Sequence, residues 1–180
     1  ANRSELLRSF ISGRPRDGVA LYRTEGYVVD RRSSGPSLID ASYMIFTGAA
    51  NAGMGHKHHD DLSFVWYAYG KELLSDAGKY TYNYTDPIRK WIISSAAHNT
   101  VLVDGRGFDG FRATIEEVFH DETLTLIQAS HRSFPAIEHV RRLVYIRPAL
   151  IFVLDDLKIV SATDMQPHQH RFEQLFHLGS

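Results

Sequence analysis

The sequence contains no cysteine, so the chain forms no disulfide bond. This excludes a small secreted scaffold stapled by disulfides, although it leaves a periplasmic or secreted location open. Long apolar runs are also missing: no stretch approaches the roughly 20 consecutive apolar residues of a membrane-spanning helix. We therefore expect no membrane span.

An excess of charge of one sign is missing as well. The chain has 20 basic and 21 acidic residues, and its formal net charge is −1. Proteins that bind nucleic acid usually carry a basic excess or a basic stripe, and none is visible here, so we expect no nucleic-acid partner. With 180 residues, of which 43% are hydrophobic and 23% charged, the chain has the length and balance of one soluble globular domain.

Strand signals, short turns and little helical periodicity predict an all-β protein, an antiparallel β-sandwich. The expected strands cover 19–22, 26–31, 38–47, 64–69, 100–103, 116–119, 123–130, 139–146, 150–157 and 171–178. Apolar residues at positions 6, 7, 10 and 11, after a possible N-cap at Ser4, predict a short N-terminal helix.

The stretch GHKHHDDLSF (55–64) stands out because it holds three histidines and two aspartates. If it is extended as a strand, His56, His58 and Asp60 share one face, with about 6 to 7 Å between successive members. A lone His-x-His pattern is common by chance and is usually structural. The next residues, 64–69, are aromatic and β-branched, which is typical of a buried strand that could hold these side chains still.

Two further residues strengthen a metal-binding interpretation. Asp76 lies at the end of an apolar run before a turn, and His98 lies just before the strand expected at 100–103. Together with the histidines of 55–64 they supply the nitrogen and oxygen ligands that zinc accepts. The spacings are long, so only the tertiary fold can bring these residues together.

Three blocks in this order, GHKHHDDLSF, YAYGKELLSDAGKYTY and SSAAHNTVLVDG, resemble the C-terminal β-domain of the heparinase II/III-like polysaccharide lyases, which include alginate lyases. In enzymes of this kind the acid, the base and the carboxylate-neutralising residues come from an N-terminal α/α toroid. The chain begins Ala1-Asn2 without Met, and we expect 1–18 to be the connector from such a missing domain and 19–180 to be the β-sandwich domain. The resemblance also implies a periplasmic or secreted protein.

The resemblance implies roles for particular residues. His56 would face the substrate and assist catalysis. A zinc ion near the active site would be bound by His58, Asp76 and His98. Asp60 is expected to orient one of the imidazoles.

The segment 80–91 is rich in tyrosine, and it also contains a tryptophan and cations. Aromatic rings stack on sugar faces and arginine pairs with carboxylates, so Tyr82, Tyr84 and Arg89 are candidates for binding an anionic polysaccharide. Aromatic side chains packed beneath a long loop are an equally common explanation.

The function that follows from the resemblance is cleavage of a uronic-acid-containing polysaccharide by β-elimination, with the chain inactive by itself because the toroid is missing. Two alternatives stay open. A cupin-like metal enzyme would need a Glu shortly after His-x-His, but the first Glu after it is Glu72, so an aspartate would have to substitute. The second alternative is a carbohydrate-binding or structural module that catalyses no reaction.

The remaining histidines give weaker signals. His168 and His170 form a second His-x-His, which we expect in a surface loop because no carboxylate accompanies it in a matching pattern. We expect His120, His131 and His139 to be structural or exposed.

Overall fold

Antiparallel strands with one apolar face are the main secondary structure of the chain. The computed structural model describes residues 17–33, 35, 38–49, 56–108, 110, 113–160 and 169–179. In β10 (Leu150–Ile159), Ile151 and Val153 are half-buried whereas Leu150 and Phe152 are exposed. Successive side chains of a strand point to opposite faces, so alternating apolar residues place one face of the strand against the core.

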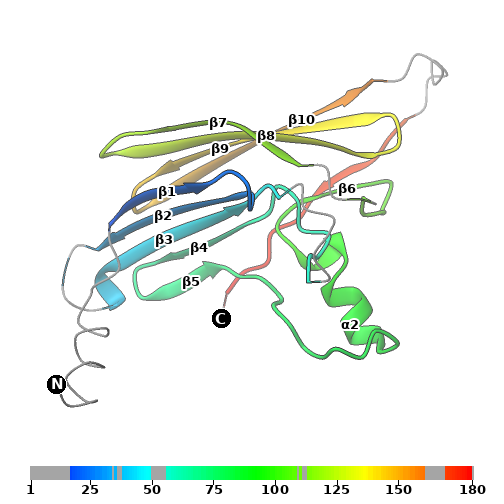
Figure 1. The fold of residues 1–180 in the computed structure, drawn as a ribbon, viewed down its shortest axis with the longest axis horizontal. Helices are drawn as coiled ribbons and strands as arrows, with labels where there is room; N and C mark the ends of the chain where they lie inside the picture. The colour runs from blue at the N-terminus through cyan, green and yellow to red at the C-terminus, as the bar shows by residue number, and fades with distance from the viewer. Residues whose placement is uncertain are drawn as a thin grey trace.

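Two antiparallel sheets stack face to face, with β7–β10 above β1–β5 in Figure 1. The first sheet contains β1 (Gly18–Tyr22), β2 (Tyr27–Ser33), β3 (Ala41–Thr47), β4 (Phe64–Ala68) and β5 (Lys71–Leu74), in that order. The second contains β7 (Thr114–His120), β8 (Leu124–Phe134), β9 (Ile137–Ile146) and β10, also in sequence order. A small third sheet pairs β6 (Val101–Val103) with β11 (Phe172–Gln174).

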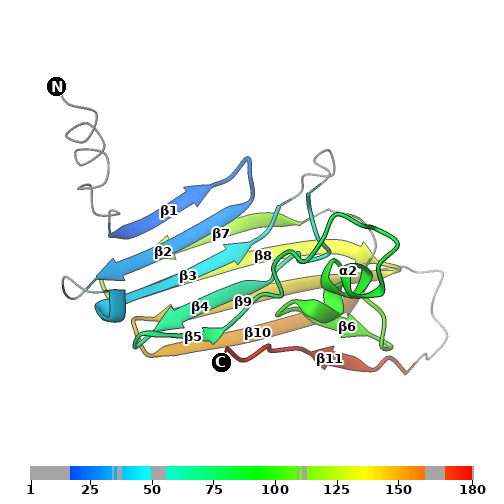
Figure 2. The same ribbon diagram turned by 90° about the horizontal axis from the view of Figure 1, so that it is seen from below.

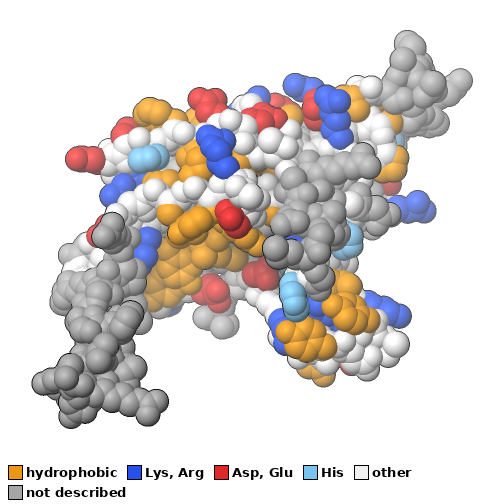
Figure 3. Space-filling view, viewed as in Figure 1, with side chains coloured by type: hydrophobic (Ala, Val, Ile, Leu, Met, Phe, Trp, Pro, Cys, Tyr) orange, Lys and Arg blue, Asp and Glu red, His pale blue; other side chains and the backbone are white. Residues whose placement is uncertain are grey.

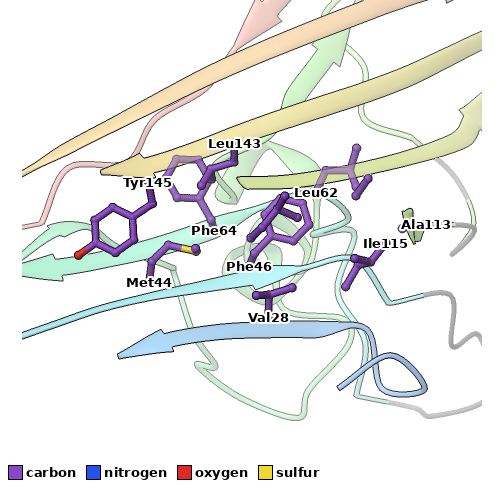
Figure 4. Close-up of a cluster of buried hydrophobic side chains, with 11 residues drawn as sticks. Val28, Met44, Phe46, Leu62, Phe64, Ala113, Ile115, Leu143 and Tyr145 are labelled. Carbon is purple, nitrogen blue, oxygen red and sulfur yellow. The ribbon is translucent and has the colours of Figure 1, made fainter. Parts of the chain in front are cut away.

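The main core fills the space between the two large sheets (Figure 4). Met44 and Phe46 from β3 and Phe64 from β4 face Leu143 and Tyr145 from β9, and all five side chains are at most 1% exposed. Burying a side chain of this size contributes about 1.5–3 kcal/mol, so the contact between the sheets is what holds the sandwich together.

The predicted antiparallel β-sandwich is confirmed, with local corrections. The strand expected at 38–47 begins with a 3-10 helix, η1 (Leu38–Asp40), and the strand expected at 171–178 is only three residues long. The segment 80–91, which we interpreted as a loop, contains α2 (Pro87–Ile92). The expected N-terminal helix and most of the expected connector fall within 1–16, outside the described residues, so the division at residue 18 stays a prediction.

Antiparallel order brings two chain connections, β3–β4 and β5–β6, to one end of the sandwich. β3 ends, β4 begins and β5 ends at the same end of the sheet. The β3–β4 connection holds the histidine-rich loop, and the β5–β6 connection holds Asp76 and α2. Figures 1 and 2 both show α2 and β6 at this end. The second 3-10 helix, η2 (Ser95–Ala97), lies between them along the chain. None of the helices within the described ranges is long and apolar enough to cross a membrane.

Candidate functional site

The histidine-rich segment is a loop, since β4 begins only at Phe64. The condition under which His56, His58 and Asp60 would share one strand face is therefore not met. Lys57 forms ion pairs with Asp60 and, at 2.8 Å, with Asp61. In a strand, residues three apart are about 10 Å from each other, so a side chain that reaches both carboxylates requires the segment to fold back. Burial alone would lower the Lys57 pKa, but the charges and hydrogen bonds of the two aspartates outweigh it and raise that pKa.

Several hydrogen bonds fasten this loop to its surroundings, among them the following three. The backbone N–H of His59 donates to the Ile93 carbonyl at 2.9 Å, and that of Leu62 donates to the Thr47 carbonyl at 2.8 Å. The Thr100 hydroxyl donates to the Asp61 carbonyl at 2.9 Å. The loop is therefore held both by the end of β3 and by the segment that follows α2.

The three predicted zinc ligands lie beside one another. His98 Nδ1 is 2.6 Å from Asp76 Oδ2, and the ring centroids of His58 and His98 are 5.4 Å apart. His98 is fully buried, and its Nε2 has no hydrogen-bond partner in the described part of the chain. As they stand, however, no three His, Asp or Glu side chains among the described residues are arranged closely enough to hold a metal ion.

Hydrogen bonding and burial shift the pKa values in this cluster. Burial of Asp76 opposes ionisation, but the hydrogen bond and charge of His98 and the Gly78 N–H outweigh it and lower the Asp76 pKa. Burial lowers the pKa of His58, and the neighbouring His98 adds to this effect. The cluster thus combines a carboxylate with a neutral imidazole, which are the protonation states that metal binding requires.

Helix α2 carries Arg89 into this cluster. Asp86 caps the helix by accepting hydrogen bonds from the N–H groups of Ile88 and Arg89, and Pro87 occupies the first turn. The Arg89 side chain is buried, and its Nη1 lies 3.1 Å from His58 Nε2. In this structure Arg89 therefore supports His58, and the predicted contact with substrate stays a prediction.

The other predicted sugar-binding residues are exposed. The Tyr82 and Tyr84 rings are 57% and 54% exposed, and the ring of exposed His56 lies 6.1 Å from that of Tyr82. Lys79 Nζ lies 3.3 Å from the centre of the Tyr82 ring, and its hydrogen bond and charge lower the Tyr82 pKa. Figure 3 shows apolar, histidine and basic side chains gathered on the lobe around α2. A ligand can reach this surface.

Asp60, expected to orient an imidazole, accepts a hydrogen bond from Lys57 instead. No hydrogen bond from an imidazole reaches its carboxylate in the described part of the chain, although its charge still acts on His58. The orienting role therefore stays a prediction, and the observed role of Asp60 is to help fold the loop.

A model of the family described as "Heparinase II/III-like, C-terminal" matches residues 14–180. The chain belongs to this heparinase II/III-like family. It is similar to an exo-oligoalginate lyase of Saccharophagus degradans, with 30% identity over a stretch that covers 41% of this chain and 11% of that protein.

Solved structures share the fold of this heparinase II/III-like chain. The heparinase III gene product BT4657 superposes with a TM-score of 0.69 at 21% identity, covering 79% of this chain and 22% of that one. A mutant of the heparan sulfate lyase HepC from Pedobacter heparinus gives a TM-score of 0.68 at 22% identity, covering 78% and 22%. The chain thus spans about a fifth of those structures.

The histidines outside this cluster differ in burial. His131 and His139 are buried, which settles the choice that the sequence left open, whereas His120 is exposed. His170 bonds Asp104 through Nδ1 at 2.8 Å, away from the cluster described above, and His168 lies outside the described residues.

The buried pair forms a directed chain of hydrogen bonds. The Ser133 N–H donates to His131 Nδ1 at 3.2 Å, so His131 carries its proton on Nε2, which lies 3.2 Å from His139 Nδ1. His139 Nε2 in turn donates to Asp155 Oδ1 at 2.7 Å. Burial, followed by the nearby His139 and Arg141, lowers the pKa of His131 from 6.5 to about 3.

Acidification is therefore expected to destabilise the protein. The unfolded chain takes up a proton at His131 as the pH falls through 6.5, whereas the folded chain does so only near pH 3. The stability present above pH 6.5 is lost progressively between these values, at about 1.4 kcal/mol per pH unit for one proton. Urea unfolding of His131→Gln, which cannot titrate, should show a shallower pH dependence by about that amount. His120→Gln serves as the exposed control, and equal slopes in all three proteins would contradict the assignment.

Proposed function

We propose that this chain is the β-domain of a polysaccharide lyase that cleaves a uronic-acid-containing polysaccharide by β-elimination. The observation that carries the proposal is the convergence of His58, Asp76 and His98 beside exposed His56 and Tyr82, in a chain of the heparinase II/III-like family. The names of its relatives, an alginate lyase and heparan-cleaving lyases, support an anionic polysaccharide as the substrate.

β-Elimination needs three functions. The uronic acid carboxylate must be neutralised, a base must remove the C5 proton, and an acid must protonate the departing glycosidic oxygen. The exposed His56 imidazole can donate to the carboxylate and hold the sugar chain, which is an electrostatic and positioning role. The exposed rings of Tyr82 and Tyr84 can stack on sugar faces, and Arg89 can pair with a carboxylate once its guanidinium turns toward the substrate.

Zinc fits the donor set of the neighbouring cluster, since two imidazoles and a carboxylate are common zinc ligands. The buried Nε2 of His98 supports this assignment, because a polar atom without a partner is rare inside proteins. His58, Asp76 and His98 would hold the ion, and Arg89 would have to leave His58 Nε2. The bound ion would then hold the loops of His58, Asp76 and His98 together and keep His56 in place.

The acid and the base are proposed to lie on an N-terminal α/α toroid, as the family resemblance implies. By itself, the chain is therefore expected to bind metal, and an anionic sugar only weakly, without turning it over. We also propose a periplasmic or secreted location, because an enzyme there has access to extracellular polysaccharides.

Two measurements test this function. Metal analysis of the purified chain should find close to one zinc per molecule. The protein in which this domain follows a toroid should convert alginate-type or heparan-type polymers to products whose new unsaturated uronic acid absorbs in the ultraviolet, while the isolated chain should not. Sugar binding without any unsaturated product, in either protein, would instead indicate a carbohydrate-binding module.

A further inference from the structure

A completely buried arginine lies behind the candidate site. Arg141 is on β9, its side chain is 0% exposed, and its Nη1 donates to the Leu62 carbonyl at 2.7 Å and to the Asn99 carbonyl at 2.6 Å. Leu62 ends the loop that carries His56 and His58, and Asn99 directly follows His98. One guanidinium group thus bridges two segments that are distant along the chain and carry the proposed functional histidines.

Asn99 extends this bridge to the third proposed ligand. Its side-chain amide donates to the Phe64 carbonyl at 2.8 Å and to the Ser75 carbonyl at 2.9 Å. Ser75 immediately precedes Asp76, so Asn99 connects the loop of His98 with that of Asp76. Asn99 is fully buried, which makes each of these bonds costly to lose.

The other side of Arg141 is fixed by Asp155, its direct partner across β9 and β10. The guanidinium donates from Nε and Nη2 to the two carboxylate oxygens of Asp155, at 2.7 and 2.8 Å. His139 and Gln174 also donate to this carboxylate, at 2.7 and 2.6 Å. Two parallel N–H···O bonds orient a planar guanidinium in a way that a lysine ammonium cannot reproduce.

We infer that Arg141 is a positioning residue for the candidate site, because it fixes the spacing between the loop of His56 and His58 and the loop of His98. This inference rests on the proposed function, because only that function gives the two loops a role. The hydrogen-bonded bridge between the loops is observed directly. Among the described residues, the hydrogen bonds of the Arg141 side chain reach Leu62, Asn99 and Asp155 and none of the proposed ligands. Arg141 therefore acts through the carbonyls of Leu62 and Asn99.

The same fold provides a matched control. Arg147 is another arginine with a nearly buried side chain, 5% exposed, which pairs with fully buried Asp30 at 2.6 Å. It lies six residues beyond Arg141, which corresponds to about 20 Å along an extended chain. It therefore shares the burial and the ion pair of Arg141 but not the link to the two loops.

The test compares Arg141→Lys with Arg147→Lys in the 180-residue chain. Both are expected to lower the melting temperature. Only Arg141→Lys should increase amide hydrogen exchange in residues 56–63 and 96–100 by about tenfold or more below the transition, since removing a buried partner frees both loops. Zinc titration against a chromophoric chelator should show a weakening of at least about tenfold, the usual size for loss of a supporting residue, with Arg147→Lys within twofold of the unmodified chain.

The outcomes are separable. Unchanged exchange and zinc affinity in Arg141→Lys, or equal losses in Arg147→Lys, would overturn the inference. If the unmodified chain binds no zinc, the proposed zinc site fails, and the exchange comparison alone decides the positioning role. If Arg141→Lys does not fold, Asp155→Asn with Asp30→Asn as its control gives the same comparison, with the same direction expected.

Discussion

Replacing His56 with alanine in the intact lyase is expected to lower kcat by about 10²- to 10⁴-fold, the usual contribution of one positioned proton-transfer or hydrogen-bonding group. His56 is exposed, so its loss leaves no cavity, and the unfolding free energy should change by less than about 0.5 kcal/mol. The rate is followed by the ultraviolet absorbance of the unsaturated product.

The control for His56→Ala is His120→Ala, which removes another exposed histidine, from β7. It should keep the activity of the unmodified enzyme. A His56→Ala enzyme with full activity would remove His56 from the mechanism and favour a sugar-binding or structural role for this end of the sandwich.

Replacing His98 is expected to abolish zinc binding. A site with three protein ligands loses one of them in His98→Ala, so the zinc content should fall from close to one per chain to near zero. The dissociation constant should rise by about 10³-fold or more, beyond the 10- to 100-fold cost of losing a supporting residue. Because His98 is fully buried, His98→Gln should be measured in parallel to separate loss of the ligand from a packing defect.

The matched control for His98→Ala is His170→Ala. His170 also holds an aspartate through Nδ1, at 2.8 Å from Asp104, but it lies outside the proposed zinc cluster. Zinc binding should survive this change. Zinc retained in both His98 variants would show that the metal, if bound, is held elsewhere.

Residue patterns anticipated the strands more successfully than the shape of the site. The expected strand at 150–157 is observed as β10 (Leu150–Ile159), because alternation of apolar residues is a local property. The shared strand face considered for His56, His58 and Asp60 does not form, because the contacts of Lys57 with Asp60 and Asp61 fold this segment into a loop. Helix α2 was missed although Asp86 followed by Pro87 is a helix-start signal, since the tyrosines before it suggested a loop.

Residue types and the family resemblance suggested that His98 and Asp76, 22 positions apart, belong to one site, but no periodic pattern in the sequence relates such distant positions. Arg141, His131 and His139 carried no signal of burial in the sequence. Charged and polar residues are usually exposed, and whether one is buried depends on the layer that packs against its strand. Only the facing sheet and the two site loops make Arg141 a buried bridge.

The sequence by itself determined the class of fold, because alternating apolar residues and turn signals act over a few neighbours, and three ordered blocks of residues determined the family. Only the tertiary structure decided which polar groups meet: His58 with Arg89, His98 with Asp76, and Arg141 with the carbonyls of two loops. The physical reason is that such contacts depend on how antiparallel strands bring distant connections to one end of the sandwich, and on which groups the facing sheet removes from water.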